Sequence, residues 1–371
     1  MDKKELFFHN LENTFKAFFI SIFFKKSKKI SPREIDFGAI KKIVVVRQHD
    51  PLGDVLISTA ILPNLIRAFP DAELDVIARP GLSEKDIFTN NPAIKEVVVF
   101  SKKEFFSPFK IFYFLNKIRR KRYDLAIIAG STSISFTSLL LAYLSKAGIR
   151  AGYSGEHFGK QLYTETFLTT PVPYDETVVK HQAVRNLDIL SYLNIPVPSN
   201  EHCMFISESE KAKALAKLEE NGIFKPADII IGIHLGANAL QNRWPAANFA
   251  AISNYLIKTP GTKIVVFYGA KEKELIDSFR SLAVNKVYIQ DPLPLREFAA
   301  MLSLLNLFIC NDTGVLHVAA AVGTKTLAIF GPTDPKQWNP LGPSHHWFRN
   351  NNESVFSITP EEILAKIKEI L

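Results

Sequence analysis

Short apolar runs alternate with longer amphipathic stretches along the 371-residue chain from Ile43 onward. The runs are continuously apolar, which predicts strands of a parallel sheet that is covered on both faces. The stretches between them carry apolar residues at helical spacing, as in the segment 54–69. We expect strands at 43–46, 73–78, 96–100 and 125–129 in the first half, and at 229–234, 263–268, 286–290, 307–310 and 326–330 in the second. The pattern predicts an α/β protein with two doubly wound, Rossmann-like domains that face a central cleft.

Proline-containing segments interrupt this alternation around a helix expected at 180–193, where His181 should form a structural hydrogen bond. They predict an N-terminal domain at 41–180, an inter-domain connection at 181–205 and a C-terminal domain at 206–371. The chain ends in a helix for which Thr359 is the expected N-cap. Whether this last helix packs back on the N-terminal domain stays open at this point.

Residues 1–40 form a basic arm of different character. Residues 1–42 hold ten Lys and Arg against five Asp and Glu, so five of the eight net positive charges lie there. Because the folded body is nearly neutral, we do not expect a nucleic-acid-binding protein. Residues 6–24 are apolar at helical spacing and precede the basic sequence KKSKK. Their most apolar segment, 17–24, is too short to span a bilayer, and no small-residue cleavage site follows it.

We expect residues 6–29 to form an interfacial helix with a basic flank that contacts an anionic membrane surface. The alternative is that this helix caps the folded body or forms a dimer. The two cysteines, Cys203 and Cys310, fit neither a disulfide framework nor a metal-binding pattern, which favours a reducing compartment. The expected location is therefore cytoplasmic and peripheral, at the inner face of the cytoplasmic membrane.

Polar, glycine-containing loops follow five of the expected strands. Their sequences are RQHDPLGD (47–54), HLGANALQNRWP (234–245), YGAKEKE (268–274), NDTG (311–314) and GPTDP (331–335). Doubly wound sheets bind their ligands at the carboxyl ends of strands, so we expect the binding site among these loops.

The NDTG loop predicts an anion-binding site. A helix that begins near Gly314 directs the free amides of its first turn toward a ligand, and its dipole favours negative charge. Gly314 permits close approach of a phosphate, Thr313 adds a hydroxyl, and His317 lies one turn further on. The alternative for this loop alone is structural: Asp312 or Thr313 caps the helix, and His317 is a partly buried helix residue.

The sequence contains no Gly-x-Gly-x-x-Gly, no Walker sequence and no Asp-x-Asp. The missing glycine fingerprint argues against a dinucleotide oxidoreductase, and the missing carboxylate pair leaves no obvious Mg²⁺ site. We therefore expect neither a cofactor nor a bound metal. If a diphosphate leaves, Arg243, His317 and Thr313 can share the neutralisation of its charge.

The most specific patterns are IVVVRQHDPLGDVLISTAILPNLIRAFPDAELDVI, HQAVRNLDILSYLNI, IGIHLGANALQNRWPAANFAAI and NDTGVLHVAAAVGTKTLAIFGPTDPKQWNP. Together they resemble glycosyltransferase family 9, the heptosyltransferases of lipopolysaccharide core assembly, along nearly all of residues 41–371. The resemblance implies a GT-B fold, with a nucleotide-diphospho-sugar donor in the C-terminal domain and a lipid-linked saccharide acceptor in the N-terminal domain. It also implies an inverting, metal-independent transfer of heptose from ADP-heptose.

The resemblance makes Asp54 in the GDV sequence the catalytic base. Gly53, next to it, and Arg47, at the end of the first expected strand, are further candidates on the acceptor side. An inverting displacement needs a base opposite the leaving group, and an ionised carboxylate suffices because the acceptor hydroxyl loses its proton late. The alternative role of Asp54 is that of a helix N-cap. Arg47 can meet an acidic acceptor, or pair with Asp50 or Asp54.

On the donor side, the resemblance implies that the diphosphate and the sugar are bound by four residues at the start of one expected helix. These are Asp312, Thr313, Gly314 and His317. Glu272 matches the acidic residue that binds the nucleotide ribose. The chain departs from the family pattern at Asn242, where the family usually has a basic residue. Either Arg243 takes over this role or the diphosphate is held less tightly.

Three alternatives remain open from the sequence. The chain can be a non-catalytic relative that binds a nucleotide-sugar or a glycan, a transferase for a different nucleotide-sugar, or another GT-B enzyme such as a nucleotide-sugar epimerase. The basic cluster at 117–122 can face anionic lipid or core phosphate, or be a solvated helix end.

Overall fold

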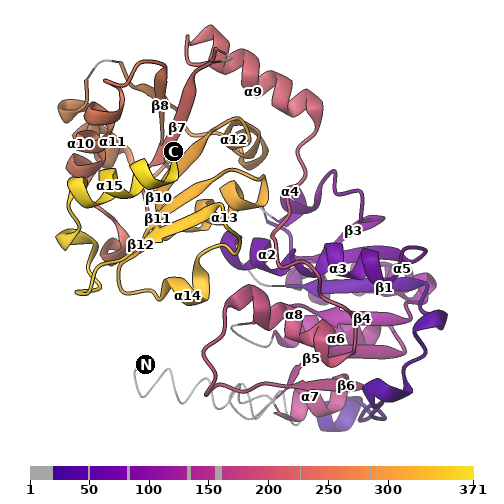
Figure 1. Ribbon diagram of the computed structural model, residues 1–371. Coiled ribbons are helices and arrows are strands. Elements are labelled where there is room, and N and C mark those ends of the chain that lie inside the picture. The colour runs from indigo at the N-terminus through magenta and orange to yellow at the C-terminus, as the bar shows by residue number, and fades with distance from the viewer. Residues whose placement is uncertain are drawn as a thin grey trace. The chain divides into compact units, whose positions relative to one another are not determined.

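The computed structural model describes residues 20–48, 51–81, 84–131, 135–154, 161–225, 227–284 and 286–371. Contacts divide the chain into two compact units. The first comprises Met1–Asp50, Ile61–Pro80 and Pro92–Ser199, and the second comprises Pro51–Ala60, Gly81–Asn91 and Asn200–Leu371. Two short segments of the N-terminal half thus belong to the second unit, whereas the sequence predicted contiguous domains (Figure 1).

Each unit is built on a six-stranded sheet. The strand orders are β3-β2-β1-β4-β5-β6 and β12-β11-β10-β7-β8-β9, and the neighbouring strands pair in parallel. Renumbered within its own unit, each order reads 3-2-1-4-5-6 in one direction or the other, which is the strand order of the Rossmann fold. The predicted α/β class and the two doubly wound sheets are therefore confirmed.

The first unit contains two strands that the sequence pattern did not reveal, β5 (Ile149–Ser154) and β6 (Thr170–Pro173). Pro171 and Pro173 suit β6 because it is an edge strand, where one row of backbone amides needs no partner. The other strands are β1 (Lys42–Arg47), β2 (Glu73–Ala78), β3 (Glu96–Val99) and β4 (Leu125–Ile128). The helices are η1 (Pro32–Glu34), η2 (Phe37–Ala39), α3 (Ile61–Ala68), η3 (Lys102–Phe106), α5 (Pro108–Lys121), α6 (Phe136–Leu144), α7 (Gln161–Phe167) and α8 (Gln182–Tyr192). His181 caps α8 by accepting from the Ala183 amide, as expected.

One hydrophobic core cluster of the second unit surrounds the fully buried Trp244 and Phe249. Its strands are β7 (Ile229–His234), β8 (Thr262–Phe267), β9 (Tyr288–Gln290), β10 (Leu307–Asn311), β11 (Thr326–Ile329) and β12 (His345–Phe348). Its helices are α2 (Leu52–Ser58), α4 (Glu84–Phe88), α9 (Glu208–Glu220), η4 (Leu240–Asn242), α10 (Ala246–Leu256), α11 (Lys273–Leu282), α12 (Leu295–Leu302), α13 (Gly314–Ala321), α14 (Pro335–Trp338), η5 (Val355–Ser357) and α15 (Pro360–Ile370).

The C-terminal helix α15 has the predicted N-cap, because the Thr359 hydroxyl accepts from the Glu362 amide and the Glu362 carboxylate accepts from the Thr359 amide. Its apolar face, Ile363, Ile367 and Ile370, lies in the core of the second unit. The helix therefore packs on the sheet of its own unit, which answers the question that the sequence left open.

The single helix expected at 54–69 is two helices, α2 and α3, separated by Thr59 and Ala60. The Thr59 hydroxyl donates to the Leu56 carbonyl at 2.6 Å and accepts from the Cys203 amide at 2.9 Å. This tie to residue 203 holds the end of α2 in the second unit.

Most of the expected interfacial helix at 6–29 lies outside the described residues. Its described end packs on the first unit: the Phe24 ring contacts Tyr143 and Phe167, and the Ser27 amide donates to the Thr166 carbonyl. Lys26 forms an ion pair with Glu165, and the Lys29 ammonium donates to two backbone carbonyls. Within the described part of the chain, no helix combines the length and the hydropathy needed to cross a membrane.

Candidate active site

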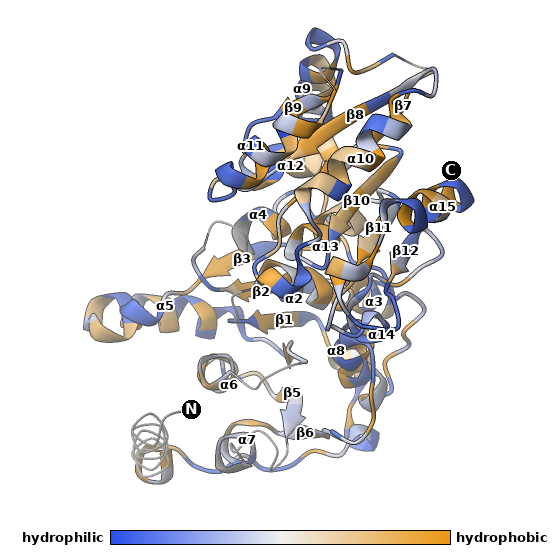
Figure 2. Ribbon diagram, turned by 90° about the vertical axis from the view of Figure 1, so that its left-hand side faces the viewer, coloured by the Kyte–Doolittle hydropathy of each residue, from blue (hydrophilic) through white to orange (hydrophobic). Residues whose placement is uncertain are grey.

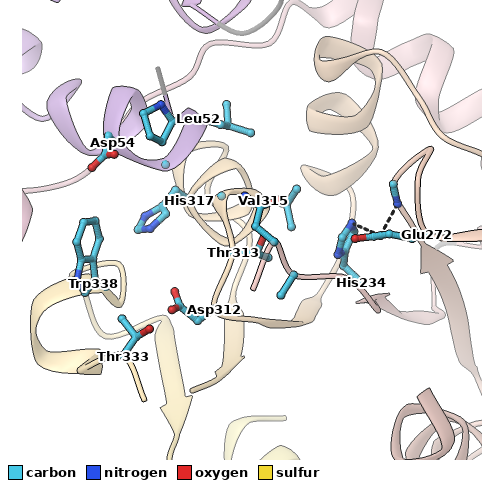
Figure 3. A pocket seen from close by; sticks show the side chains of 16 residues that line it. Leu52, Asp54, His234, Glu272, Asp312, Thr313, Val315, His317, Thr333 and Trp338 are labelled. Carbon is cyan, nitrogen blue, oxygen red and sulfur yellow. Dashed lines mark hydrogen bonds and ion pairs between the residues drawn. The ribbon is translucent and has the colours of Figure 1, made fainter. Parts of the chain in front are cut away.

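A pocket of about 620 Å³ lies within the second unit (Figure 3). Its lining comes from the start of α2, the carboxyl ends of β7, β8 and β10, the start of α13 and the segment around α14. The lining residues are Pro51, Leu52, Gly53, Asp54, His234, Ala237, Asn238, Gly269, Glu272, Asp312, Thr313, Gly314, Val315, His317, Thr333 and Trp338. The pocket therefore lies at the edge of the sheet where a Rossmann fold binds its ligands.

Two glycines bring α2 and α13 together at this pocket. A Cβ atom on Gly53 would lie 2.9 Å from His317 Cδ2, and one on Gly314 would lie 3.3 Å from Leu52 Cβ. Side chains at either position would force the two helices apart. The close approach places Asp54 of α2 and His317 of α13 in the lining of the same pocket.

Asp54 lies in the first turn of α2, where its carboxylate faces the positive end of the helix dipole. The N-cap of this helix is Pro51, without a side-chain hydrogen bond, so Asp54 is not the capping residue that the sequence allowed. In Figure 3, the carboxylates of Asp54 and Asp312 lie on opposite sides of the His317 ring.

The start of α13 has the features of an anion site. Thr313 is the N-cap in extended conformation, but its hydroxyl makes no capping hydrogen bond. The structural alternative for the NDTG loop therefore fails for Thr313, and the hydroxyl lines the pocket with Gly314 and Val315. The first amides of a helix have no acceptor within the helix, so they favour an anionic ligand here.

Asn311 organises the loop on the other side of the pocket. Its fully buried side chain donates to the Leu235 carbonyl at 2.9 Å and to the Gly236 carbonyl at 3.2 Å. Its Oδ1 accepts from the Trp244 amide at 2.9 Å. These bonds fix the course of residues 235–244 relative to the end of β10. The first residue of the NDTG sequence thus has a positioning role that the sequence did not reveal.

Asp312 is bound by two neutral donors rather than by a cation. Asn242 Nδ2 donates to Asp312 Oδ2 at 3.0 Å and lies 3.2 Å from Thr333 Oγ1. Burial raises the pKa of Asp312 above its usual range, and a hydrogen bond from Thr333 opposes this rise. Asn242 therefore acts on the pocket through Asp312 and Thr333 and does not line it.

Glu272 occupies a space that only glycine leaves open. Its Oε2 accepts from the Gly269 amide at 2.6 Å. A Cβ atom on Gly236 would lie 1.7 Å from Glu272 Oε1, so no side chain fits at 236 while the carboxylate is in place. The carboxylate thus lies at the ends of β7 and β8, inside the lining of the pocket.

His234 stands beside Glu272, with 3.9 Å between His234 Nε2 and Glu272 Oε2. Burial lowers the pKa of His234, and the Glu272 carboxylate opposes this effect. The Gly236 amide donates to Nδ1, which leaves the proton of the neutral ring on Nε2, toward Glu272.

The structure brings together most, but not all, of the residues predicted for the site. Gly53, Asp54, Glu272, the three residues from Asp312 to Gly314, and His317 line one pocket. Arg243 does not line it, because its guanidinium donates to the Ala237 carbonyl at 2.7 Å. Arg47 is buried at the end of β1 in the first unit and donates to the Ala129 carbonyl at 3.1 Å.

The lining also contains residues that were not among the predicted site residues, and His234 and Trp338 are two of them. His234 ends β7, so its place at a carboxyl strand end was a usable signal. Trp338 ends the short helix α14, whose start is capped by Asp334 of the GPTDP turn. Among the described residues, no group of three or more His, Cys, Asp and Glu side chains is placed to hold a metal ion.

Comparison with known proteins gives a consistent family assignment. The profile of "Glycosyltransferase family 9 (heptosyltransferase)" matches residues 111–367. Lipooligosaccharide heptosyltransferase 2 of Haemophilus influenzae is 23% identical over 343 residues, which cover 86% of this chain and 96% of that protein.

Two solved structures share the fold. A family 9 glycosyl transferase from Veillonella parvula has a TM-score of 0.78 at 23% identity, covering 91% of this chain and 98% of that one. The E. coli ADP-heptose LPS heptosyltransferase II has a TM-score of 0.72 at 22% identity, covering 89% of this chain and 98% of that one. The chain belongs to glycosyltransferase family 9, as its sequence motifs indicated, and it is a glycosyltransferase.

Proposed function

We propose that this glycosyltransferase moves heptose from ADP-heptose to a lipid-linked saccharide of the lipopolysaccharide core, with inversion at the anomeric carbon and without a metal ion. The observation that carries the proposal is the meeting of Asp54 with the first turn of α13 in one pocket. Heptose and ADP are supported by the names of the Haemophilus influenzae relative and of the E. coli enzyme. A lipid-linked acceptor places the reaction at the inner face of the cytoplasmic membrane.

The donor is held from two sides of the pocket. Its diphosphate binds the amides that open α13 and the Thr313 hydroxyl, which lie together in the lining. The ribose hydroxyls donate to Glu272, which the Gly269 amide already orients.

Asp312 serves the sugar rather than the diphosphate in this arrangement. A second ionised carboxylate near a diphosphate would be repulsive. Burial raises the pKa of Asp312, and the bonds from Asn242 and Thr333 spread its charge over neutral donors. Its remaining acceptor capacity suits the hydroxyls of a sugar.

Asp54 then acts as the general base. The acceptor oxygen forms a bond to the anomeric carbon while the bond from that carbon to the diphosphate oxygen breaks. The acceptor proton passes to the Asp54 carboxylate, and ADP leaves with the electron pair of the broken bond. His317 and the α13 amides stabilise the charge that develops on the diphosphate.

The decisive experiment measures ADP release and the mass of the product from ADP-heptose and a Kdo-containing lipid A acceptor. Asp54→Asn should lower kcat by about 10²–10⁴-fold while the protein stays folded, because the amide cannot accept the proton. A folded Asp54→Asn enzyme with near-normal turnover would remove Asp54 from the mechanism.

Asn242 favours one second candidate, a transferase that uses a different nucleotide-sugar. The amide brings no positive charge to the pocket, in contrast to the basic residue expected from the family. A thermal-shift screen of ADP-heptose, ADP-glucose, UDP-sugars and GDP-sugars separates these cases, since a specific ligand stabilises the folded state. Stabilisation by another nucleotide-sugar, but not by ADP-heptose, would support this second candidate.

A further inference from the structure

The first unit carries a row of aromatic side chains on its surface. Among the described residues, the four most exposed large hydrophobic side chains are Phe106 (88%), Phe109 (88%), Tyr113 (73%) and Phe112 (71%). Phe106 ends η3, and the other three lie on the first two turns of α5 at helical spacing i, i+3 and i+4. We call these four residues the aromatic patch. In Figure 2, α5 projects past the ends of β1 and β2 and carries hydrophobic residues on its outer turns.

The fold does not need the aromatic patch for its own packing. The opposite face of α5 is buried through Phe114 and Ile118. The Phe114 ring lies 4.5 Å from the ring of Phe100, which also contacts Phe105 at 4.9 Å. Exposed apolar groups of this size usually mark an interaction surface.

The charge around the patch identifies the partner. Residues 101–122 contain eight Lys and Arg and one acidic residue, Glu104. Lys117 and Lys121 are committed to ion pairs with Glu96 and Asp75. In the part of the chain that the structure describes, no ion pair engages Lys102, Lys103, Lys110 or Arg120, all of which are exposed. Free cations thus flank the aromatic rings on both sides.

We propose that η3 and the first two turns of α5 dock into an anionic lipid surface. Aromatic rings partition into the boundary between headgroups and acyl chains, and lysines beside them bind the phosphates. A protein partner would have to match four exposed rings and four exposed cations that form no ion pair among the described residues, whereas an anionic bilayer offers both environments at once. This surface is distinct from residues 6–29, and the proposal does not depend on which sugar the enzyme transfers.

A tryptophan introduced at position 109 reports the insertion directly. The full-length Phe109→Trp variant is mixed with phosphatidylglycerol vesicles that contain brominated acyl chains, and wild-type emission is subtracted. We expect the emission from position 109 to shift to the blue and to fall at least about twofold by bromine quenching. The matched control is Phe356→Trp, at a ring that is 64% exposed in the second unit, where no quenching is expected. Equal quenching at 109 and 356, or none at 109, would overturn the proposal.

Vesicle sedimentation measures how much the aromatic patch and the lysines beside it contribute to membrane affinity. The triple variant Phe106→Ser, Phe109→Ser and Phe112→Ser should bind anionic vesicles at least about tenfold more weakly than wild type. Lys102→Glu with Lys103→Glu should weaken binding about tenfold or more, and salt at about 1 M should have the same effect. Wild-type binding by the serine variant would assign the membrane contact to residues 1–29 and refute this surface.

Two other occupants give different results. If residues 1–19 of the same chain cover the patch, the emission of the Phe109→Trp variant is already blue-shifted before vesicles are added. If a second copy covers it, the wild type is a dimer by light scattering and the serine variant is a monomer. Either result, without bromine quenching at position 109, contradicts docking to lipid.

Discussion

Replacing Gly236 by alanine tests whether Glu272 binds the donor from the position that the structure shows. A Cβ atom at 236 lies 1.7 Å from Glu272 Oε1 and 2.1 Å from its Cδ, whereas carbon atoms in contact stay about 3.5 Å apart. The methyl group and the carboxylate cannot occupy this space together. Because the carboxylate ends a flexible side chain, it should rotate away and give up its 2.6 Å bond from the Gly269 amide.

The size of the effect follows from the bond that the donor loses. A hydrogen bond to a charged group contributes about 1.5–3 kcal/mol, which corresponds to about 10- to 150-fold in affinity. We expect Gly236→Ala to raise KM for the donor by this factor. The value of kcat should change less, because Asp54 and the start of α13 belong to other parts of the lining.

The assay is steady-state ADP release at varied donor concentration, for wild type, Gly236→Ala, Glu272→Ala and the double variant. Glu272→Ala removes the carboxylate that the new methyl group would displace, so the double variant should have the same KM as Glu272→Ala alone. Gly148→Ala is the matched control, since a Cβ atom there meets only the Asp124 carbonyl at 3.6 Å. A wild-type KM for Gly236→Ala, or additive effects in the double variant, would refute the reasoning.

Three further predictions concern the spacing between α2 and α13, the pH dependence of stability and a partly buried ion pair. Gly53→Ala puts a Cβ atom 2.9 Å from His317 Cδ2, so kcat should fall about tenfold or more while Tm changes by only a few degrees. An unchanged kcat would show that the close spacing of α2 and α13 is irrelevant to catalysis. Burial lowers the pKa of His345 to about 4, so as pH falls this imidazole is protonated in the unfolded chain before it is protonated in the folded protein. The free energy of unfolding therefore falls as pH drops from about 6.5 toward 4. Between about pH 7 and pH 4.5, urea unfolding should show wild type losing about 2 kcal/mol more than His345→Gln, and equal losses would contradict this. Arg296 binds Glu210 at 2.5 Å and donates to the carbonyls of Asp86 and Phe205. Arg296→Met should therefore lower the free energy of unfolding by about 2 kcal/mol, and an unchanged urea midpoint would contradict the structural role of the pair.

The sequence predicted the architecture well where apolar runs were continuous and central. The five expected strands of the C-terminal half all exist. Four of them, β7, β8, β10 and β11, are central and read as apolar segments, and the fifth, β9, is an edge strand. Strands β5, β6 and β12 escaped prediction because their sequences, IRAGYS, TPVP and HHWF, contain Arg, Gly, Pro or His in place of a continuous apolar run. Their sequences therefore lack the pattern on which the other predictions depended.

The candidate site was predictable in its helix starts but not in its side-chain directions. The NDTG loop indicated the opening of α13 through residue types that cap helices and admit anions. Nothing in the sequence showed that Arg243 turns to the Ala237 carbonyl or that Asn242 binds Asp312. These choices depend on contacts between loops far apart in the chain, such as the bond between Asn311 and Trp244.

The assignment of α2 to the second unit bears on how the chain is made. Val55, Leu56 and Ile57 are fully covered in the native protein, yet they leave the ribosome about 260 residues before the end of α13, the helix against which α2 packs. At about 5–20 residues per second, this wait is roughly 13–50 seconds. During that time the apolar residues of α2 are exposed on the nascent chain, because α13 has not yet been synthesised. Slowing translation after residue 60 should therefore increase the binding of chaperones to the nascent chain. For the same reason, a fragment begun at residue 200 would lack a piece of its own interior, and supplying residues 51–60 as a separate peptide should restore part of its stability.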